Sequence, residues 1–269
     1  MSKLLVSANS IEHLCKLLDK DIDGVILYID KLSVNSSFYV DVDIIEKVDF
    51  KDKEIFICLN KIMHNDDLEY LDNVLIYLKD KNVKILYYDM GVYNMCRRHD
   101  MVSKLVIYQD HLNTSILSNK FYYDMGVCGS YISSDITKDE LLQIKKSTKM
   151  DIYFTVYGYL PIFYSRRYLV SNYLEYIGED KGNDYKIVSD IGDSYPICEE
   201  GYGATIYTKE VVNLINELNE INEIDYIVMH SNMIDDLEFN MMVDKFINHD
   251  KMDDCYLGFF NTKTIYKVK

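Results

Sequence analysis

Short apolar runs alternate with stretches of helical period along the chain. Eight of these runs are β-branched or aromatic, end at a polar residue, and so predict strands. The predicted strands are Leu4–Ser7, Val25–Ile29, Ile55–Leu59, Ile85–Tyr88, Leu105–Tyr108, Gly129–Ile132, Ile152–Val156 and Tyr226–Met229. Apolar residues three and four apart predict helices over 10–20, 41–48, 66–80, 91–99, 113–124, 137–146, 209–221 and 235–247.

The alternation of strand and helix with short connections favours a parallel sheet joined by right-handed crossovers. Eight repeats in about 250 residues match the size of a (β/α)8 barrel, so we predict an α/β, TIM-barrel-like fold. A doubly wound open sheet is the alternative. No Pro/Gly/Ser-rich linker interrupts the chain, which predicts a single domain over 1–269. A hairpin-like pattern within 180–208 predicts a small β insertion after the seventh strand, while the role of 209–269 stays open.

Composition and charge narrow the function classes. The chain is 48% hydrophobic and 27% charged, which is typical of a globular protein and not of a disordered one. Its formal net charge of −15 repels a phosphate backbone, so direct binding of nucleic acid is expected to be weak. The sequence contains no uncharged apolar run of about 18 residues, and its first seven residues resemble a strand. We therefore expect a soluble cytoplasmic protein that does not enter a membrane.

The sequence offers few motifs for metal, nucleotide or hydrolase chemistry. Six cysteines lie far apart without a C-x-x-C pair and are expected to be mostly buried thiols. No G-x-G-x-x-G, P-loop, G-x-S-x-G or H-E-x-x-H pattern occurs. The histidines at 13, 64, 99 and 249 have no partner at metal-ligand spacing, so we predict no metal site.

Polar residues at the ends of the predicted strands are the candidate site. In a barrel these ends gather at the C-terminal rim, where active sites lie. His111, Asp135 and His230 are the candidate proton-transfer groups, because histidine titrates near neutral pH. Amides and an acid that could orient a small molecule are Asn60, Asp89, Gln109 and Asn113. The alternative is that these residues only cap helices or stabilise loops.

Two adjacent arginines form a local positive spot in this acidic chain. Arg166 and Arg167 follow a strand and the aromatic turn that begins at Tyr157. A guanidinium binds a carboxylate or phosphate through two parallel hydrogen bonds, so the pair could hold a small anion. The alternative is charge balance by nearby acids such as Glu175 and Glu179.

The order of several short segments resembles a known family. These are Cys58-Leu59-Asn60, Tyr88-Asp89-Met90-Gly91-Val92, Gln109-Asp110-His111-Leu112-Asn113, the segment 132–141, and 156–161 with 165–169. Together they resemble the collagenase-like peptidases of unassigned catalytic type, peptidase family U32, over roughly residues 1–210. The resemblance implies a TIM-barrel-like domain. It also places Tyr157 where the family has a histidine, and Asp135 where the family has a glutamate.

Some members of this family hold an iron–sulfur cluster, and the resemblance places one of its cysteines at the position of Tyr168. Only Cys198 follows in the segment that is rich in cysteine in those members. Four thiolates are the usual ligands of such a cluster, so we expect neither a cluster nor another cofactor here.

The family's activities leave three hypotheses. The first is an accessory subunit in prephenate-linked, oxygen-independent hydroxylation of a tRNA uridine, with a longer, cysteine-bearing paralogue as partner. The second is a peptidase, as the family name implies. The third is a non-catalytic protein that binds a small molecule or acts as a scaffold. Whether the chain is an enzyme stays open at this point.

Overall fold

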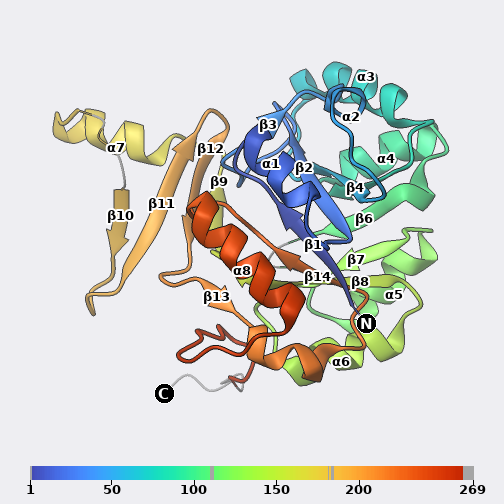
Figure 1. Ribbon diagram of the computed structural model, residues 1–269. Coiled ribbons are helices and arrows are strands. Elements are labelled where there is room, and N and C mark those ends of the chain that lie inside the picture. The colour runs from blue at the N-terminus through green and yellow to red at the C-terminus, as the bar shows by residue number, and fades with distance from the viewer. Residues whose placement is uncertain (1, 110–111, 181, 183–184, 263–269) are drawn as a thin grey trace. The chain divides into compact units, whose positions relative to one another are not determined.

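The computed structural model describes residues 2–109, 112–180, 182 and 185–262, and these form two compact units. The first unit comprises Met1–Gly158 and Val212–Lys269, and the second comprises Tyr159–Val211. Each unit is described separately below. Figure 1 shows the elements of both.

Eight parallel strands of the first unit close into a barrel. Their order is β1, β2, β4, β5, β6, β7, β8 and β14, and β14 pairs in parallel with both β8 and β1. The strands are β1 Lys3–Ser7, β2 Gly24–Ile29, β4 Glu54–Leu59, β5 Val83–Tyr87, β6 Leu105–Tyr108, β7 Gly129–Tyr131, β8 Asp151–Gly158 and β14 Tyr226–Met229. The short strand β3 (Tyr39–Val40) adds to β2. The predicted strands and the TIM-barrel-like fold are confirmed.

Helices connect these strands, and in most of them the buried apolar face follows the predicted period. In α3, for example, Leu71, Val74, Leu75 and Leu78 are buried. The α-helices of this unit are α1 Ile11–Leu18, α2 Ile44–Lys47, α3 Leu68–Leu78, α4 Met90–Arg98, α5 Ile116–Asp124, α6 Lys138–Ser147 and α8 Asp236–Asn248. Two 3₁₀ turns, η1 Asn65–Asp67 and η2 Val102–Lys104, precede α3 and β6. No helix among the residues described is long and apolar enough to cross a membrane.

The predicted helix over 209–221 is wrong. Its first part forms the short strand β13 (Val212–Asn213), which pairs antiparallel with Tyr157 and Gly158 at the end of β8. The remainder is a 3₁₀ helix, η3 (Ile215–Ile221), whose buried residues Ile215, Leu218 and Ile221 are spaced by three. Residues three apart lie on one face of a 3₁₀ helix, so this spacing suits the tighter helix.

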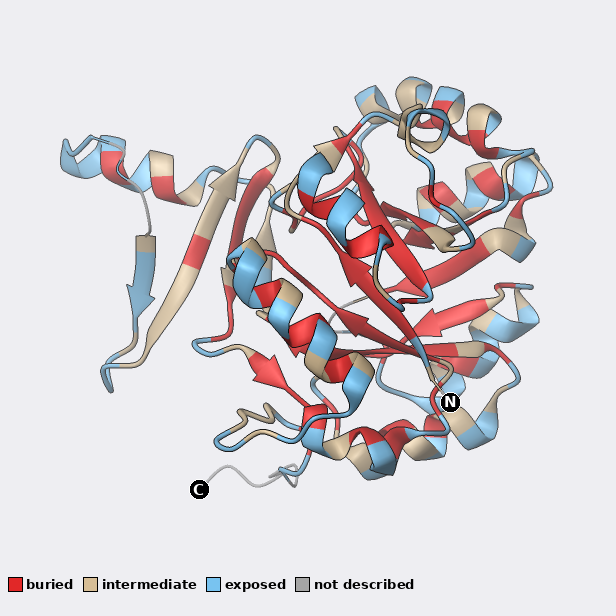
Figure 2. Ribbon diagram, viewed as in Figure 1, coloured by how far each residue is buried: buried red, intermediate tan, exposed pale blue. Residues whose placement is uncertain are grey.

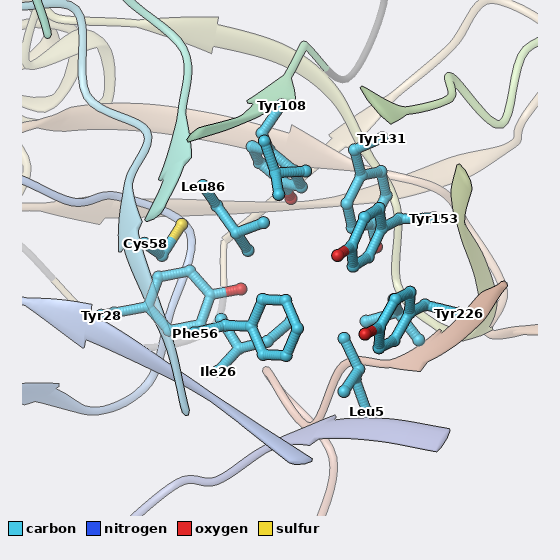
Figure 3. Close-up of a cluster of buried hydrophobic side chains, with 12 residues drawn as sticks. Leu5, Ile26, Tyr28, Phe56, Cys58, Leu86, Tyr108, Tyr131, Tyr153 and Tyr226 are labelled. Carbon is cyan, nitrogen blue, oxygen red and sulfur yellow. The ribbon is translucent and has the colours of Figure 1, made fainter. Parts of the chain in front are cut away.

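Aromatic side chains fill the barrel interior (Figure 3). The rings of Tyr153 and Tyr226 are stacked with centroids 4.4 Å apart, and Phe56 packs edge-on against both at 5.6–5.7 Å. The inward-facing cluster is Leu5, Ile26, Tyr28, Phe56, Cys58, Leu86, Val106, Tyr108, Tyr131, Tyr153, Tyr226 and Val228. Figure 2 shows the barrel strands as a mostly buried layer. The interior is therefore a packed core.

A network of charged and hydroxyl groups closes the N-terminal end of this core. The ammonium group of Lys84 donates to the hydroxyls of Tyr226 at 2.8 Å and Tyr153 at 3.2 Å, and to Asp151 at 3.3 Å. Tyr226 donates to Glu54 at 2.9 Å, and Glu54 also pairs with Lys3. Burial alone would lower the pKa of Lys84, but the hydrogen bond to Tyr226 and the nearby carboxylates raise it above its ordinary value.

The second unit is a small antiparallel sheet with one helix. The sheet has the order β10 (Tyr185–Val188), β11 (Ser194–Glu200), β12 (Gly203–Tyr207) and β9 (Pro161–Ser165). Helix α7 (Leu169–Ile177) packs on it through Val170 and Leu174, which meet Ile197 and Ala204. Strands β10, β11 and β12 lie within the predicted insertion 180–208, whereas β9 and α7 lie upstream of it.

Replacing Lys84 with methionine should destabilise the barrel. The change leaves two tyrosine hydroxyls and two carboxylates short of a donor, at an expected cost of about 1–3 kcal/mol in the free energy of unfolding. The matched control is Lys81→Met, because Lys81 pairs with Glu46 at a more exposed site and should contribute little to stability. Urea titration of both variants measures the difference. Equal losses would contradict a structural role for Lys84.

Candidate functional site

His230 lies at the C-terminal end of the barrel, directly after β14. Its backbone amide donates to Tyr157 O at 2.9 Å, which ties it to β8. The register between β14 and β8 shifts between Val228 and Met229, and such irregularities re-aim neighbouring side chains. Gly158 permits this close approach: its φ is +133°, and a Cβ there would lie 2.8 Å from His230 O. Local backbone geometry therefore fixes the position of His230.

The imidazole of His230 is hydrogen-bonded to two tyrosine hydroxyls inside the barrel. Nε2 lies 2.8 Å from the hydroxyl of Tyr131, and Nδ1 lies 3.3 Å from the hydroxyl of Tyr28. The Tyr131 hydroxyl also lies 2.7 Å from Oγ1 of Thr155. These four side chains, here called the His230 cluster, come from β2, β7, β8 and the end of β14.

Burial keeps His230 neutral. It lowers the pKa of His230 from 6.5 to about 4, since the charged imidazolium is poorly solvated in this core. A neutral imidazole has one donor and one acceptor nitrogen, and each hydroxyl of the cluster can both donate and accept. The His230 cluster can therefore pass a proton along a continuous chain of hydrogen bonds at neutral pH.

Two of the predicted binding amides are engaged within the protein. Asn60 is buried, accepts from Val34 N at 2.8 Å and donates to Val34 O at 3.0 Å, which secures the loop after β2. Asn113 is also buried and donates to Ser130 Oγ at 2.7 Å and Tyr131 O at 2.9 Å. A ligand would have to replace these contacts to reach either amide.

The other predicted rim residues hold local structure. Asp89 caps α4 by accepting from Gly91 N at 2.7 Å, and it also accepts from Met63 N at 3.0 Å. Gln109 accepts from the hydroxyl of Tyr122 at 3.1 Å.

Asp135 is exposed on the loop before α6, and its carboxylate accepts a hydrogen bond from Ser133 Oγ at 3.3 Å. His111, the remaining proton-transfer candidate, lies outside the described residues.

Tyr157 and the two arginines belong to different units. Tyr157 is buried in the first unit, where its ring packs against Phe239 and Phe246 of α8 at 6.0 Å. Arg166 and Arg167 follow β9 in the second unit, and the Arg167 side chain is exposed. Nη1 of Arg166 is buried and hydrogen-bonds to no described residue, and this burial lowers the pKa of the guanidinium.

Sequence reasoning missed most of the His230 cluster. His230 was a candidate because it follows a strand, but Tyr28, Tyr131 and Thr155 were not. The signal that could have found them is the period of two along each strand, because Tyr28 and Tyr131 share the inward face with the core residues. With 25 tyrosines in the chain, tyrosine content alone did not single them out.

A separate cavity of about 670 Å³ opens at the opposite, N-terminal end of the barrel. Its lining includes Lys3, Glu54, Lys84, Asp151 and Tyr226, which are the groups of the network described above. These groups already hydrogen-bond to one another, and closing the N-terminal end of the barrel is enough to explain their presence. The His230 cluster is therefore the better candidate for chemistry.

The cysteines do not fit an iron–sulfur cluster. Cys58 lies in β4 inside the barrel, Cys96 is buried in α4, and Cys15 is exposed on α1. Burial raises the pKa of Cys96 to about 12 and that of Cys128 to about 11, because an apolar environment solvates a thiolate poorly. No three His, Cys, Asp or Glu side chains of the described part of the chain gather as metal ligands.

A closed parallel barrel with a buried polar cluster at the C-terminal ends of its strands defines this chain as a TIM-barrel protein. The sequence profile of peptidase family U32 matches residues 11–238, and the chain belongs to this family. The solved structure of the U32 peptidase Mk0906 superposes with a TM-score of 0.53 at 11% identity, covering 86% of this chain and 92% of that one. This likeness supports the fold.

A further relative is the tRNA hydroxylation protein P2 of Bacillus subtilis (strain 168). It is 26% identical over 193 residues, which cover 64% of this chain and 60% of that protein. The match thus spans only about 60% of the relative's length. An orotidine 5′-monophosphate decarboxylase from Metallosphaera sedula matches with a TM-score of 0.45 and 11% identity over 93% of this chain.

The depressed pKa of His230 predicts a loss of stability in acid. In the unfolded chain His230 binds a proton below about pH 6.5, whereas in the folded chain it binds one only near pH 4. Between pH 7 and 4 the wild type should therefore lose roughly 3 kcal/mol more than a His230→Gln variant, which has no group to titrate there. Urea titrations at several pH values measure this difference, with His249→Gln, at an exposed position after α8, as the control. Parallel pH profiles of wild type and His230→Gln would contradict the assignment.

Proposed function

We propose that this chain is a cytoplasmic accessory subunit in oxygen-independent hydroxylation of a tRNA uridine. The observation that carries the proposal is the likeness to the Bacillus subtilis tRNA hydroxylation protein P2, within a family that the chain shares over residues 11–238. The His230 cluster is the part of the barrel that would serve the reaction.

The geometry of the His230 cluster favours proton handling over proteolysis. A peptidase of the nucleophilic kind needs a serine or cysteine hydrogen-bonded to its base. Both ring nitrogens of His230 are instead engaged by the hydroxyls of Tyr28 and Tyr131. A neutral histidine that orients tyrosine hydroxyls can donate to or accept from a bound small molecule without forming a covalent intermediate.

The arginines of the second unit supply the proposed contact to an anion. Nη1 of Arg166 is buried and has no hydrogen-bond partner among the described residues, and such an unmet donor favours an acceptor from outside. A dicarboxylate such as prephenate offers carboxylate oxygens suited to a guanidinium. Arg167, exposed next in sequence, would contribute a second positive charge.

A second protein completes the proposal. The net charge of −15 disfavours direct approach to tRNA, and the six cysteines are scattered over the fold. A longer paralogue of the same family that bears the cluster cysteines would provide both the redox group and the affinity for RNA.

Deletion of the gene should remove a hydroxylated uridine from total tRNA. Mass spectrometry of digested nucleosides from deleted and complemented cells measures this. We expect the wild type and the control His99→Gln to restore the nucleoside, and His230→Gln or Tyr131→Phe to restore far less, because each breaks the hydrogen-bonded chain of the His230 cluster. An unchanged nucleoside profile after deletion would refute the proposed function.

Prephenate should raise the thermal midpoint of the purified protein. A ligand that binds only the folded state at about a hundred times its dissociation constant adds roughly 2.7 kcal/mol of stability. Arg166→Gln should abolish the shift, while Lys186→Gln, an exposed cation of the same unit, should preserve it. If the shift is the same in all three proteins, the arginine does not hold the anion.

A further inference from the structure

The loop that follows His230 leads from β14 to α8 and is held on two sides. The pairing of β14 with β1 ends at Met229 and Val6, one residue before His230 (Figure 1). On the other side, the backbone amide of His230 donates to Tyr157 O in β8. Beyond Met229, the side of the loop that faces β1 is therefore no longer held by the strand ladder.

Ser7, the last residue of β1, holds the start of this loop. Its Oγ accepts a hydrogen bond from Ser231 N at 2.9 Å and lies 3.1 Å from Ser231 Oγ. Both serines are buried, so a lost bond would leave a buried amide without an acceptor. The amide of His230 is thus bound on the β8 side, and the next amide is bound on the β1 side.

Asn9, two residues beyond Ser7, holds the end of the same loop. Its Nδ2 donates to Ile234 O at 2.8 Å and to Asp236 Oδ1, at the start of α8, at 3.0 Å. Helix α1 fixes Asn9 in turn, because the backbone amide of Asn9 donates to Nδ1 of the fully buried His13 at 3.2 Å. The segment after β1 therefore contacts the loop at both of its ends.

The backbone between these two contacts is strained. Met233 has a φ of +61°, which is uncommon for a residue with a side chain. Such a conformation persists when the surrounding contacts determine it. Hydrogen bonds also weaken steeply as their geometry departs from the ideal, so a small shift of this loop would disturb the contacts that the imidazole of His230 makes.

We propose that Ser7 and Asn9 are positioning residues that hold the loop after β14, so that the imidazole of His230 meets the two tyrosine hydroxyls of its cluster. Both act through the loop. The use of this geometry in a reaction rests on the proposed function, whereas the geometry itself can be measured without it.

NMR titration of the histidine rings in the full-length protein tests the proposal, with His230→Gln to assign the signal. From about pH 8 to about pH 5, His230 of the wild type should stay almost entirely neutral, because burial lowers its pKa to about 4. Ser7→Ala leaves the Ser231 amide without its acceptor, so the imidazole should shift and gain contact with water. We expect its pKa to rise by at least about one unit toward 6.5, which is about a tenfold change in proton affinity.

The matched control is Ser231→Ala, which removes the same contact between hydroxyls but keeps the amide bond to Ser7. It should leave the pKa of His230 low, and so should Ser7→Thr, which retains an acceptor oxygen. Asn9→Ala removes the second contact from a half-buried position and should also raise this pKa, which tests the proposal even if Ser7→Ala does not fold. An unchanged pKa in Ser7→Ala and Asn9→Ala would overturn the proposal, and so would an equal rise in Ser231→Ala.

The nucleoside profile separates this inference from the proposed function. If the pKa of His230 responds as expected but deletion of the gene leaves the profile unchanged, the positioning role stands and the proposed function fails. If deletion removes the nucleoside but the pKa does not respond to Ser7→Ala or Asn9→Ala, the positioning role alone is refuted.

Discussion

The filling of the barrel interior by aromatic rings is the constraint on which the rest of this structure depends. Eight short parallel strands enclose a space that is usually filled by branched aliphatic side chains. Here stacked Tyr153 and Tyr226 occupy much of it, and every tyrosine carries a hydroxyl that is costly to bury without a partner. Lys84 meets this need at the N-terminal end and His230 meets it at the C-terminal end.

The two ends of the barrel supply partners for the tyrosine hydroxyls with different groups, a charged ammonium at one end and a neutral imidazole at the other. The N-terminal end is partly solvated, so an ammonium group can remain charged among tyrosines and carboxylates. At the C-terminal end His230 is buried, and an imidazole that stays neutral there costs less than a charge. A neutral imidazole between hydroxyls can still exchange protons. The C-terminal end, with His230, is thus the one suited to chemistry on a small molecule.

The fold was predictable because each barrel strand is buried on both sides and forms a continuous apolar run bounded by polar residues. The α-helix predicted over 209–221 is wrong because, over two turns, apolar spacings of three residues resemble those of three to four residues. His230 was predictable from its place after a strand. Tyr28 and Tyr131 were not, because their meeting depends on strand register between residues about a hundred or more positions apart.

The same limitation explains why the asparagines predicted to bind a ligand instead contact other parts of the protein in the structure. A strand-end asparagine can face a ligand or a neighbouring loop, and the sequence around Asn113 does not distinguish these. In the fold, Asn113 contacts Ser130 and Asn119, so the inner side of α5 carries polar groups. Polar residues that look like a ligand pocket in the sequence therefore hold α5 against the barrel.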